Sequence, residues 1–92
     1  MPTHSFDRYL KHLEDDPETA QALEEERLVL NVSDAINKAR LDSGLTQRQL
    51  AERSGISRIT ITRIENGQFN PSIRTIAALA HAMGKKATVT ID

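Results

Sequence analysis

The chain has 92 residues and a mass of 10.3 kDa, 38% apolar and 27% charged, which allows one small globular unit and excludes a multidomain enzyme. The absence of cysteine excludes disulfide bonds and cysteine-based zinc sites, and three aromatic residues are too few for a module that stacks unpaired bases. The formal net charge is −1, no apolar run approaches the ~20 residues of a membrane span, and the N-terminus lacks a signal-peptide pattern, so we expect a cytoplasmic protein without a membrane partner.

Residues 1–30 form an acidic arm. They carry three Lys or Arg against eight Asp or Glu, a net −5, whereas residues 31–92 carry nine against five, a net +4. A short helix is predicted after Ser5 as its cap, with an apolar stripe of Phe6, Tyr9, Leu10 and Leu13. A helix this short does not persist alone, so the stripe must cover a surface. Either it folds back on the arm itself, or a cationic partner with an apolar groove binds it.

A long helix is predicted over residues 17–42. Asp16 as the N-cap and Pro17 at the first helical position mark its start, and Gly44 follows its end. Apolar residues recur between these points at helical spacing. The alternative is that a separate helix begins at Ser33.

Three shorter helices are predicted next, over residues 46–53, 57–66 and 72–84. The middle one contains a conflict, because residues 59–62 alternate apolar and polar side chains and their β-branched residues favour a strand. We predict a helix because Ser57 provides an N-cap and because Ile61 and Ile64 form an i, i+3 pair that is buried only in a helix.

Residues 87–91 are predicted as a short β-strand. A lone strand needs a neighbour for its N–H and C=O groups. We expect the same strand of a second subunit to pair with it through Ala87, Val89 and Ile91, giving a two-fold homodimer. The alternative is a frayed C-terminus.

Residues 45–67 fit the spacing of a DNA-binding helix-turn-helix. Ala51 is small enough for the two helices to cross, Gly55 allows the turn between them, and four apolar residues close the core beneath, at Leu50, Ile56, Ile61 and Ile64. Any helical hairpin with a glycine turn is the alternative.

The second motif helix separates a buried side from an exposed one, given about 100° per residue. Arg58 and Arg63 suit guanine O6 and N7, Ile59 suits a thymine methyl, and Thr62 can donate or accept, so we expect these four to contact bases. Phosphate contacts are expected at helix ends and the following loop, from Thr46, Gln47, Ser57, Asn66, Gln68 and Asn70. The alternative for this second group is ordinary capping and turn chemistry, and for the arginines a solvated surface charge.

The segment 40–84 resembles the Cro/CI-type (XRE) helix-turn-helix family. The matching residues are Leu45, Thr46, Gln47, Leu50, Ala51, Gly55, Ile56, Ser57, Ile61, Ile64, Glu65, Asn66, Gly67, Pro71 and Ser72. The resemblance implies a dimer on double-stranded operator DNA and an ion pair between Arg40 and Glu65. Ser54 departs from the family, which usually has an apolar residue there.

The wider layout, with an acidic arm before the motif, is similar to HigA-type antitoxins. That resemblance implies a small basic toxin partner of the RelE/ParE-like (HigB-type) class, neutralised in the complex, and repression of the protein's own operon. The alternatives are a free-standing XRE-type repressor whose arm only dimerises and a protein-only adaptor that has lost DNA binding.

The sequence as a whole predicts an all-α protein: a five-helix bundle with a lambda-repressor-like helix-turn-helix and a short C-terminal β-strand. Residues 1–30 are expected to bind the toxin and residues 31–92 to bind DNA and dimerise. The three histidines have no second ligand or nucleophile nearby, so no enzyme activity, metal, cofactor or small-molecule substrate is expected.

Overall fold

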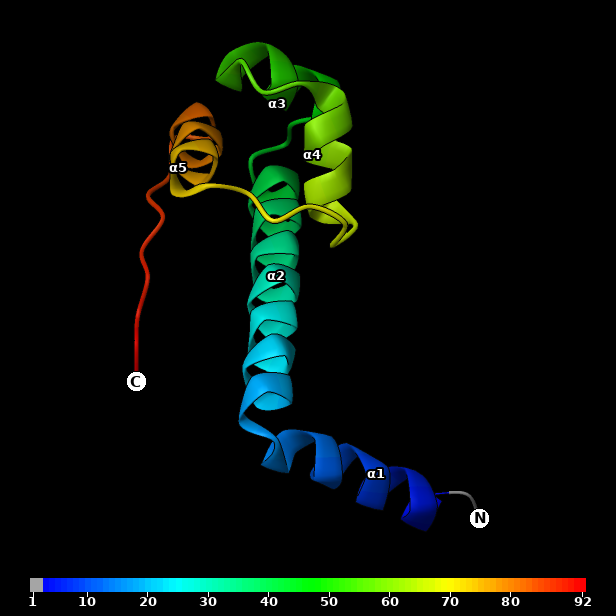
Figure 1. Cartoon of the computed structure of the whole chain (residues 1–92). Helices are drawn as coiled ribbons and strands as arrows, with labels where there is room; N and C mark the ends of the chain where they lie inside the picture. Colours follow the sequence, from blue (N-terminus) through cyan, green and yellow to red (C-terminus); the bar gives the residue numbers. More distant parts are fainter. Residues whose placement is uncertain (1–2) are drawn as a thin grey trace.

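The computed structural model describes residues 3–92, without the side chains of residues 3, 4, 13 and 14. Five helices account for its regular structure: α1 (Thr3–Asp15), α2 (Pro17–Asp42), α3 (Gln47–Ser54), α4 (Arg58–Glu65) and α5 (Ile73–Ala82). In Figure 1, α3, α4 and α5 gather around the C-terminal half of α2, and α1 projects from its other end. The all-α prediction is confirmed for the described residues. Among these helices, none combines the length and apolar content that crossing a membrane requires.

Helix α1 stands clear of the bundle and makes its contacts with α2 (Figure 1). The helix begins at Thr3, ahead of Ser5, so the prediction that Ser5 is its N-cap is wrong. Helix ends commonly differ by one or two residues between assignments. Phe6 and Tyr9 are 59% and 57% exposed, and Leu10 is half-buried. The alternative, in which the stripe folds back on the arm itself, is therefore wrong for both aromatic rings. The predicted fourth member, Leu13, lies outside the described side chains.

Helix α2 has the predicted bounds. The Asp16 carboxylate accepts from the Glu18 N–H at 3.2 Å, and Pro17 occupies the first helical position, where no partner for an N–H is needed. The alternative start at Ser33 is wrong, because α2 is continuous there and Ser33 is buried, donating to the Glu65 carbonyl oxygen at 2.6 Å. The boundary drawn between residues 30 and 31 lies inside α2, so arm and body share one helix.

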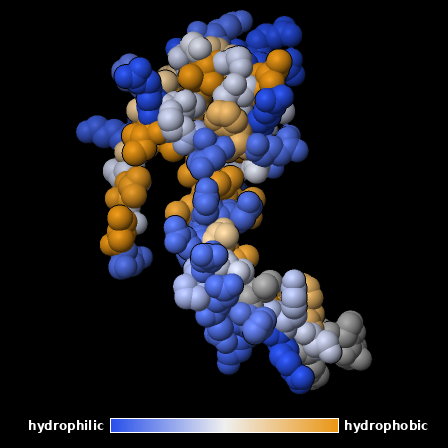
Figure 2. Space-filling view, viewed as in Figure 1, coloured by the Kyte–Doolittle hydropathy of each residue, from blue (hydrophilic) through white to orange (hydrophobic). Residues whose placement is uncertain are grey.

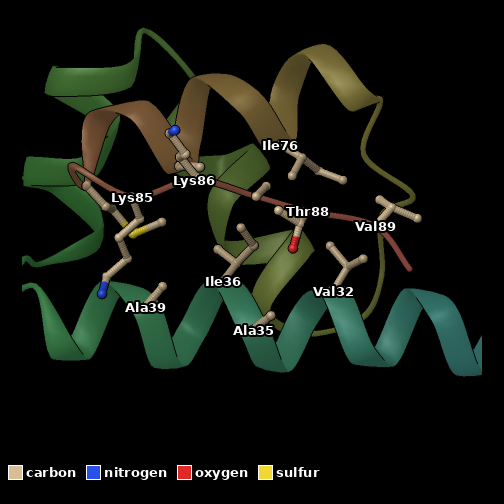
Figure 3. Close-up of a pocket in the computed structure, with 12 residues that line it drawn as sticks. Val32, Ala35, Ile36, Ala39, Ile76, Lys85, Lys86, Thr88 and Val89 are labelled. Carbon is tan, nitrogen blue, oxygen red and sulfur yellow. The ribbon is translucent and has the colours of Figure 1, made fainter. Parts of the chain in front are cut away.

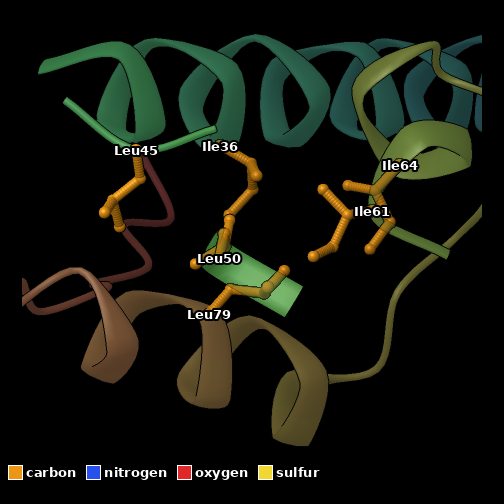
Figure 4. Packing of buried hydrophobic residues seen from close by; sticks show 6 residues of the cluster. All are labelled: Ile36, Leu45, Leu50, Ile61, Ile64 and Leu79. Carbon is orange, nitrogen blue, oxygen red and sulfur yellow. The ribbon is translucent and has the colours of Figure 1, made fainter. Parts of the chain in front are cut away.

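The core lies where α2, α3, α4 and α5 meet. Figure 4 shows its six buried side chains pointing toward one another, from Ile36, Leu45, Leu50, Ile61, Ile64 and Leu79. Ile61 and Ile64 are 0% and 1% exposed, which a strand could not achieve for residues three apart. The helix predicted against local propensity is therefore confirmed, and burial of its apolar side outweighs the β-branched preference.

Two glycines shape the turns beside α4. Gly55 ends α3 with φ +76°, a left-handed conformation that glycine adopts without strain. Gly67 follows α4 with φ +71°, and a Cβ there would lie 3.0 Å from Leu30 Cδ2 of α2. Ser54 is the position where the sequence departs from the family pattern. Its hydroxyl accepts a hydrogen bond from the Ile56 N–H at 3.1 Å, so this polar residue supports the turn.

The C-terminal segment 85–92 leaves α5 and runs back beside α2 (Figures 1 and 3). The predicted strand at residues 87–91 is wrong for the single chain, because no strand occurs in residues 3–92. The physical reason is that a strand exists only against a neighbour, and the helices here offer no sheet edge. Figure 2 shows apolar surface along this segment, which lines an apolar groove together with residues of α2 such as Val32 and Ile36.

Candidate nucleic-acid interface

The exposed side of α4 brings the predicted base-contacting residues together. Arg58, Ile59, Thr62 and Arg63 line one shallow, open depression, which also includes Gln68 from the following loop. Ile59 is 67% exposed although it is apolar. Ile61 and Ile64 face the core on the opposite side of the same helix. We refer to this depression as the reading surface.

The predicted phosphate-contacting residues lie either at the N-termini of α3 and α4 or at the C-terminal end of α4 and in the loop that follows it. The Thr46 and Ser57 hydroxyls accept from the N–H groups of Gln49 and Thr60 at 3.0 and 3.1 Å, so both act as helix N-caps. Asn66 is the C-cap of α4, while Gln68 and Asn70 are exposed beyond it. A second open depression lies at the start of α3, lined by Arg40, Thr46, Gln47, Arg48 and Arg58.

A buried ion pair joins α2 to the end of α4. Arg40 donates from Nε to Glu65 Oε2 at 2.8 Å and from Nη2 to Oε1 at 2.9 Å, a bidentate arrangement. Its Nη1 donates to the Leu45 carbonyl oxygen at 2.9 Å. The side chains of Arg40 and Glu65 are 12% and 4% exposed. The ion pair implied by the family resemblance is confirmed.

Two further side chains complete this network and were missed by sequence reasoning. Asn37 Nδ2 and Gln47 Nε2 donate to Glu65 Oε1 at 2.8 and 3.3 Å. A signal was present for α2, because Ser33, Asn37 and Arg40 stand at i, i+4 and i+7 and so share one helix face. The contact from Gln47 depends on how α3 packs beside α4, and sequence spacing does not give that.

The network keeps the carboxylate ionised. Burial raises the pKa of Glu65, but hydrogen bonds from Arg40, Asn37 and Gln47 outweigh it, so the pKa lies below that of an ordinary glutamate. The hydrogen bond with Glu65 raises the pKa of Arg40. Both groups are therefore charged at neutral pH.

Gln47 links this buried network to the reading surface. Its Oε1 lies 3.0 Å from the Thr62 hydroxyl oxygen, which donates to it, while its Nε2 faces Glu65. The Thr62 hydroxyl is also 2.9 Å from the Arg58 carbonyl oxygen. A side chain expected to contact phosphate is thus also a structural connection between α3 and α4.

A helix-turn-helix family model matches residues 36–89, which include α3, the Gly55 turn, α4 and α5. The chain belongs to this helix-turn-helix family. An uncharacterized HTH-type transcriptional regulator of Methanothermobacter thermautotrophicus is 41% identical over 51 residues, 55% of this chain and 74% of its own length. The immunity repressor protein of Bacillus phage phi105 is 36% identical over 62 residues, 67% of this chain and 43% of that protein.

A third relative is named Antitoxin HicB 1, from Photorhabdus laumondii subsp. laumondii. It is 39% identical over 52 residues, which are 56% of this chain and 34% of that protein. No solved structure gives a significant match. The chain thus carries the helix-turn-helix of a DNA-binding family, and two of the relatives it matches are named as a transcriptional regulator and a repressor.

Proposed function

We propose that the protein is a repressor that binds operator DNA as a dimer, with α4 in the major groove. The observation that carries this proposal is the reading surface, where two arginines flank an exposed isoleucine on one side of a helix whose other side is core. Arginine pairs with guanine O6 and N7, and an apolar side chain contacts the thymine methyl. The basic charge of residues 31–92 favours the phosphate backbone.

Phosphate contacts come from the rim of this surface. Because the Thr46 and Ser57 hydroxyls are engaged as caps, we expect the free N–H groups of the first turns of α3 and α4 to bind phosphate beside them. Gln47 keeps one Nε2 proton beyond the one given to Glu65, and Gln68 and Asn70 are exposed. These residues position the protein, whereas the reading surface selects the sequence.

Replacing Arg63 with alanine should relax base preference at one position of the operator, at a cost of about 1–3 kcal/mol on the preferred duplex. The reason is that only the preferred duplex offers the bidentate partner. The measurement is competition binding of the full chain to its selected duplex and to a random duplex of equal length. Arg74→Ala removes the same charge from an exposed position on α5, and it should leave the ratio of the two affinities unchanged. Equal losses on both duplexes for Arg63→Ala would contradict the assignment.

We propose that the C-terminal segment provides the dimer contact through Ala87, Val89 and Ile91. Val89 and Ile91 are among the most exposed apolar side chains of the chain. The segment, through Ala87 and Val89, also lines an apolar groove of about 300 Å³ together with α2 and α5 (Figure 3). A strand formed only on pairing with a second copy accounts for its absence in one chain.

We propose, as a second function, that residues 1–30 bind a small basic toxin of the RelE/ParE-like (HigB-type) class, which makes the protein an antitoxin. The arm carries a net −5 and α1 presents Phe6 and Tyr9 to solvent, clear of the DNA-binding body formed by residues 31–92. Exposed aromatic rings within a charged surface are typical anchors of protein interfaces. Similarity over 52 residues to a protein named as an antitoxin supports an antitoxin role in general, and the toxin class rests on the acidic, aromatic arm.

The double change Phe6→Ala and Tyr9→Ala should weaken partner binding by about 30-fold or more, because two aromatic anchors are removed. Both rings are exposed, so the fold, the dimer and operator binding should be unaffected. The test is a search for a small basic protein encoded beside this gene, its co-expression with this chain, and titration of the purified partners. Ile73→Ala on α5, also at an exposed apolar residue, serves as the control. Unchanged partner binding would contradict the assignment of Phe6 and Tyr9 as anchors, and lost operator binding by a folded dimer would make the arm structural. No binding of such a protein by the wild type would favour the free-standing repressor.

A further inference from the structure

The Thr62 hydroxyl has one proton and two candidate acceptors inside the protein. Gln47 Oε1 lies 3.0 Å from the hydroxyl oxygen and the Arg58 carbonyl oxygen lies 2.9 Å from it. Thr62 also lines the reading surface and is half-buried. A hydroxyl offers one donor and two acceptor lone pairs, so the direction of the proton decides what the surface presents.

The buried carboxylate fixes the orientation of the Gln47 amide. An ionised carboxylate only accepts hydrogen bonds, and Glu65 Oε1 lies 3.3 Å from Gln47 Nε2. Turning the amide over would bring two oxygens together in a poorly solvated place, which is strongly unfavourable. Glu65 therefore sets the Nε2 group toward itself and leaves Oε1 facing Thr62.

This orientation draws the Thr62 proton into the protein. If the hydroxyl turned its proton to the DNA, its oxygen would face two acceptor oxygens with no proton between them. With the proton directed to Gln47 or to the Arg58 carbonyl, the hydroxyl presents only lone pairs to the reading surface. Unlike Arg58 and Arg63, which only donate, Thr62 then accepts.

We propose that Thr62 is a specificity residue that accepts a hydrogen bond from a base amino group, adenine N6 or cytosine N4, and disfavours a base with a keto oxygen at that place. The inference rests on the proposed binding of α4 in the major groove. It gives a distinctive signature: at one position, on one strand, adenine and cytosine are exchangeable, whereas guanine and thymine weaken binding. We expect a factor of about five to ten, the net worth of one hydrogen bond.

The test uses the full chain and duplexes selected from a randomised library. Competition binding then measures all four base pairs at each position for the wild type, Thr62→Val and Thr62→Ser. The wild type and Thr62→Ser should share the amino-over-keto preference, and Thr62→Val should lose it at that position alone. Replacing adenine there with the unsubstituted base purine removes the N6 amino group. This should weaken DNA binding by the wild type by the same factor and leave binding by Thr62→Val unchanged.

The outcomes separate this inference from the proposed function. If duplexes are selected and Arg63→Ala relaxes one position, but Thr62→Val changes no preference, the assignment of Thr62 is overturned while DNA reading by α4 stands. A keto preference that Thr62→Val removes would overturn the proton direction derived above. If the wild type retains no duplex, the proposed function and this inference both fail.

Discussion

Replacing Arg40 with methionine should lower the free energy of unfolding by about 3–5 kcal/mol, because it leaves the Glu65 carboxylate buried without its cation. Glu65 would keep only the hydrogen bonds from Asn37 and Gln47. The measurement is urea denaturation followed by circular dichroism. Lys38→Met is the matched control, since it breaks the exposed pair between Lys38 and Asp34 on the same helix and should cost less than about 1 kcal/mol.

The pH dependence provides a second measure of the same pair. In the wild type the pKa of Glu65 lies below the ~4.3 of an unfolded glutamate, so its contribution is present above that pH and is lost as the pH falls through the folded-state pKa. In Arg40→Met, burial without the guanidinium should raise the pKa of Glu65, and acidification should then reduce the stability deficit. Combining Arg40→Met with Glu65→Leu should recover much of the loss. A deficit as small as that of Lys38→Met would show that the pair contributes little.

Replacing Ile61 with alanine should cost about 2–5 kcal/mol, because its fully buried side chain would leave a cavity between α2, α3 and α5. The matched control is Ile59→Ala, the same substitution two positions earlier on the same helix. Ile59 is exposed, so its removal should change the stability by no more than about 0.5 kcal/mol. Thermal and urea unfolding of the two variants give the comparison.

This pair of variants also tests the conformation of α4. In a strand, residues 59 and 61 would face the same side and the two substitutions would have similar costs. In the helix, they lie on opposite sides and the costs differ severalfold. Equal effects would contradict both the helix and the reading surface that depends on it.

The helices were predictable because their ends are encoded locally. Asp16, Thr46, Ser57 and Ser72 each cap a helix through a hydrogen bond to an N–H two or three residues ahead. The separation of Ile59 from Ile61 follows from helical geometry once α4 is accepted as a helix. These features need only neighbours in sequence, which is why spacing sufficed.

The errors concern contacts with distant or additional chain segments. The strand at residues 87–91 was predicted from composition, yet a strand depends on a partner edge. The apolar stripe of α1 was predicted to cover either the arm itself or a partner, and the exposure of Phe6 and Tyr9 within this chain excludes only the first for these two rings. A pattern of apolar residues indicates that a surface is made for contact, but not which molecule provides the other side.

Local sequence signals were enough to predict the five helices, the helix-turn-helix spacing and the acidic arm, since caps, glycines and charges act over a few residues. The contact of Gln47 with both Glu65 and Thr62 could not be predicted in this way, because Gln47 lies on α3 and the other two lie on α4, and the helices meet through packing. The type of residue at each position was readable, whereas the orientation of each polar group was not. That orientation depends on the partner facing it across the fold, and here the buried carboxylate of Glu65 sets it.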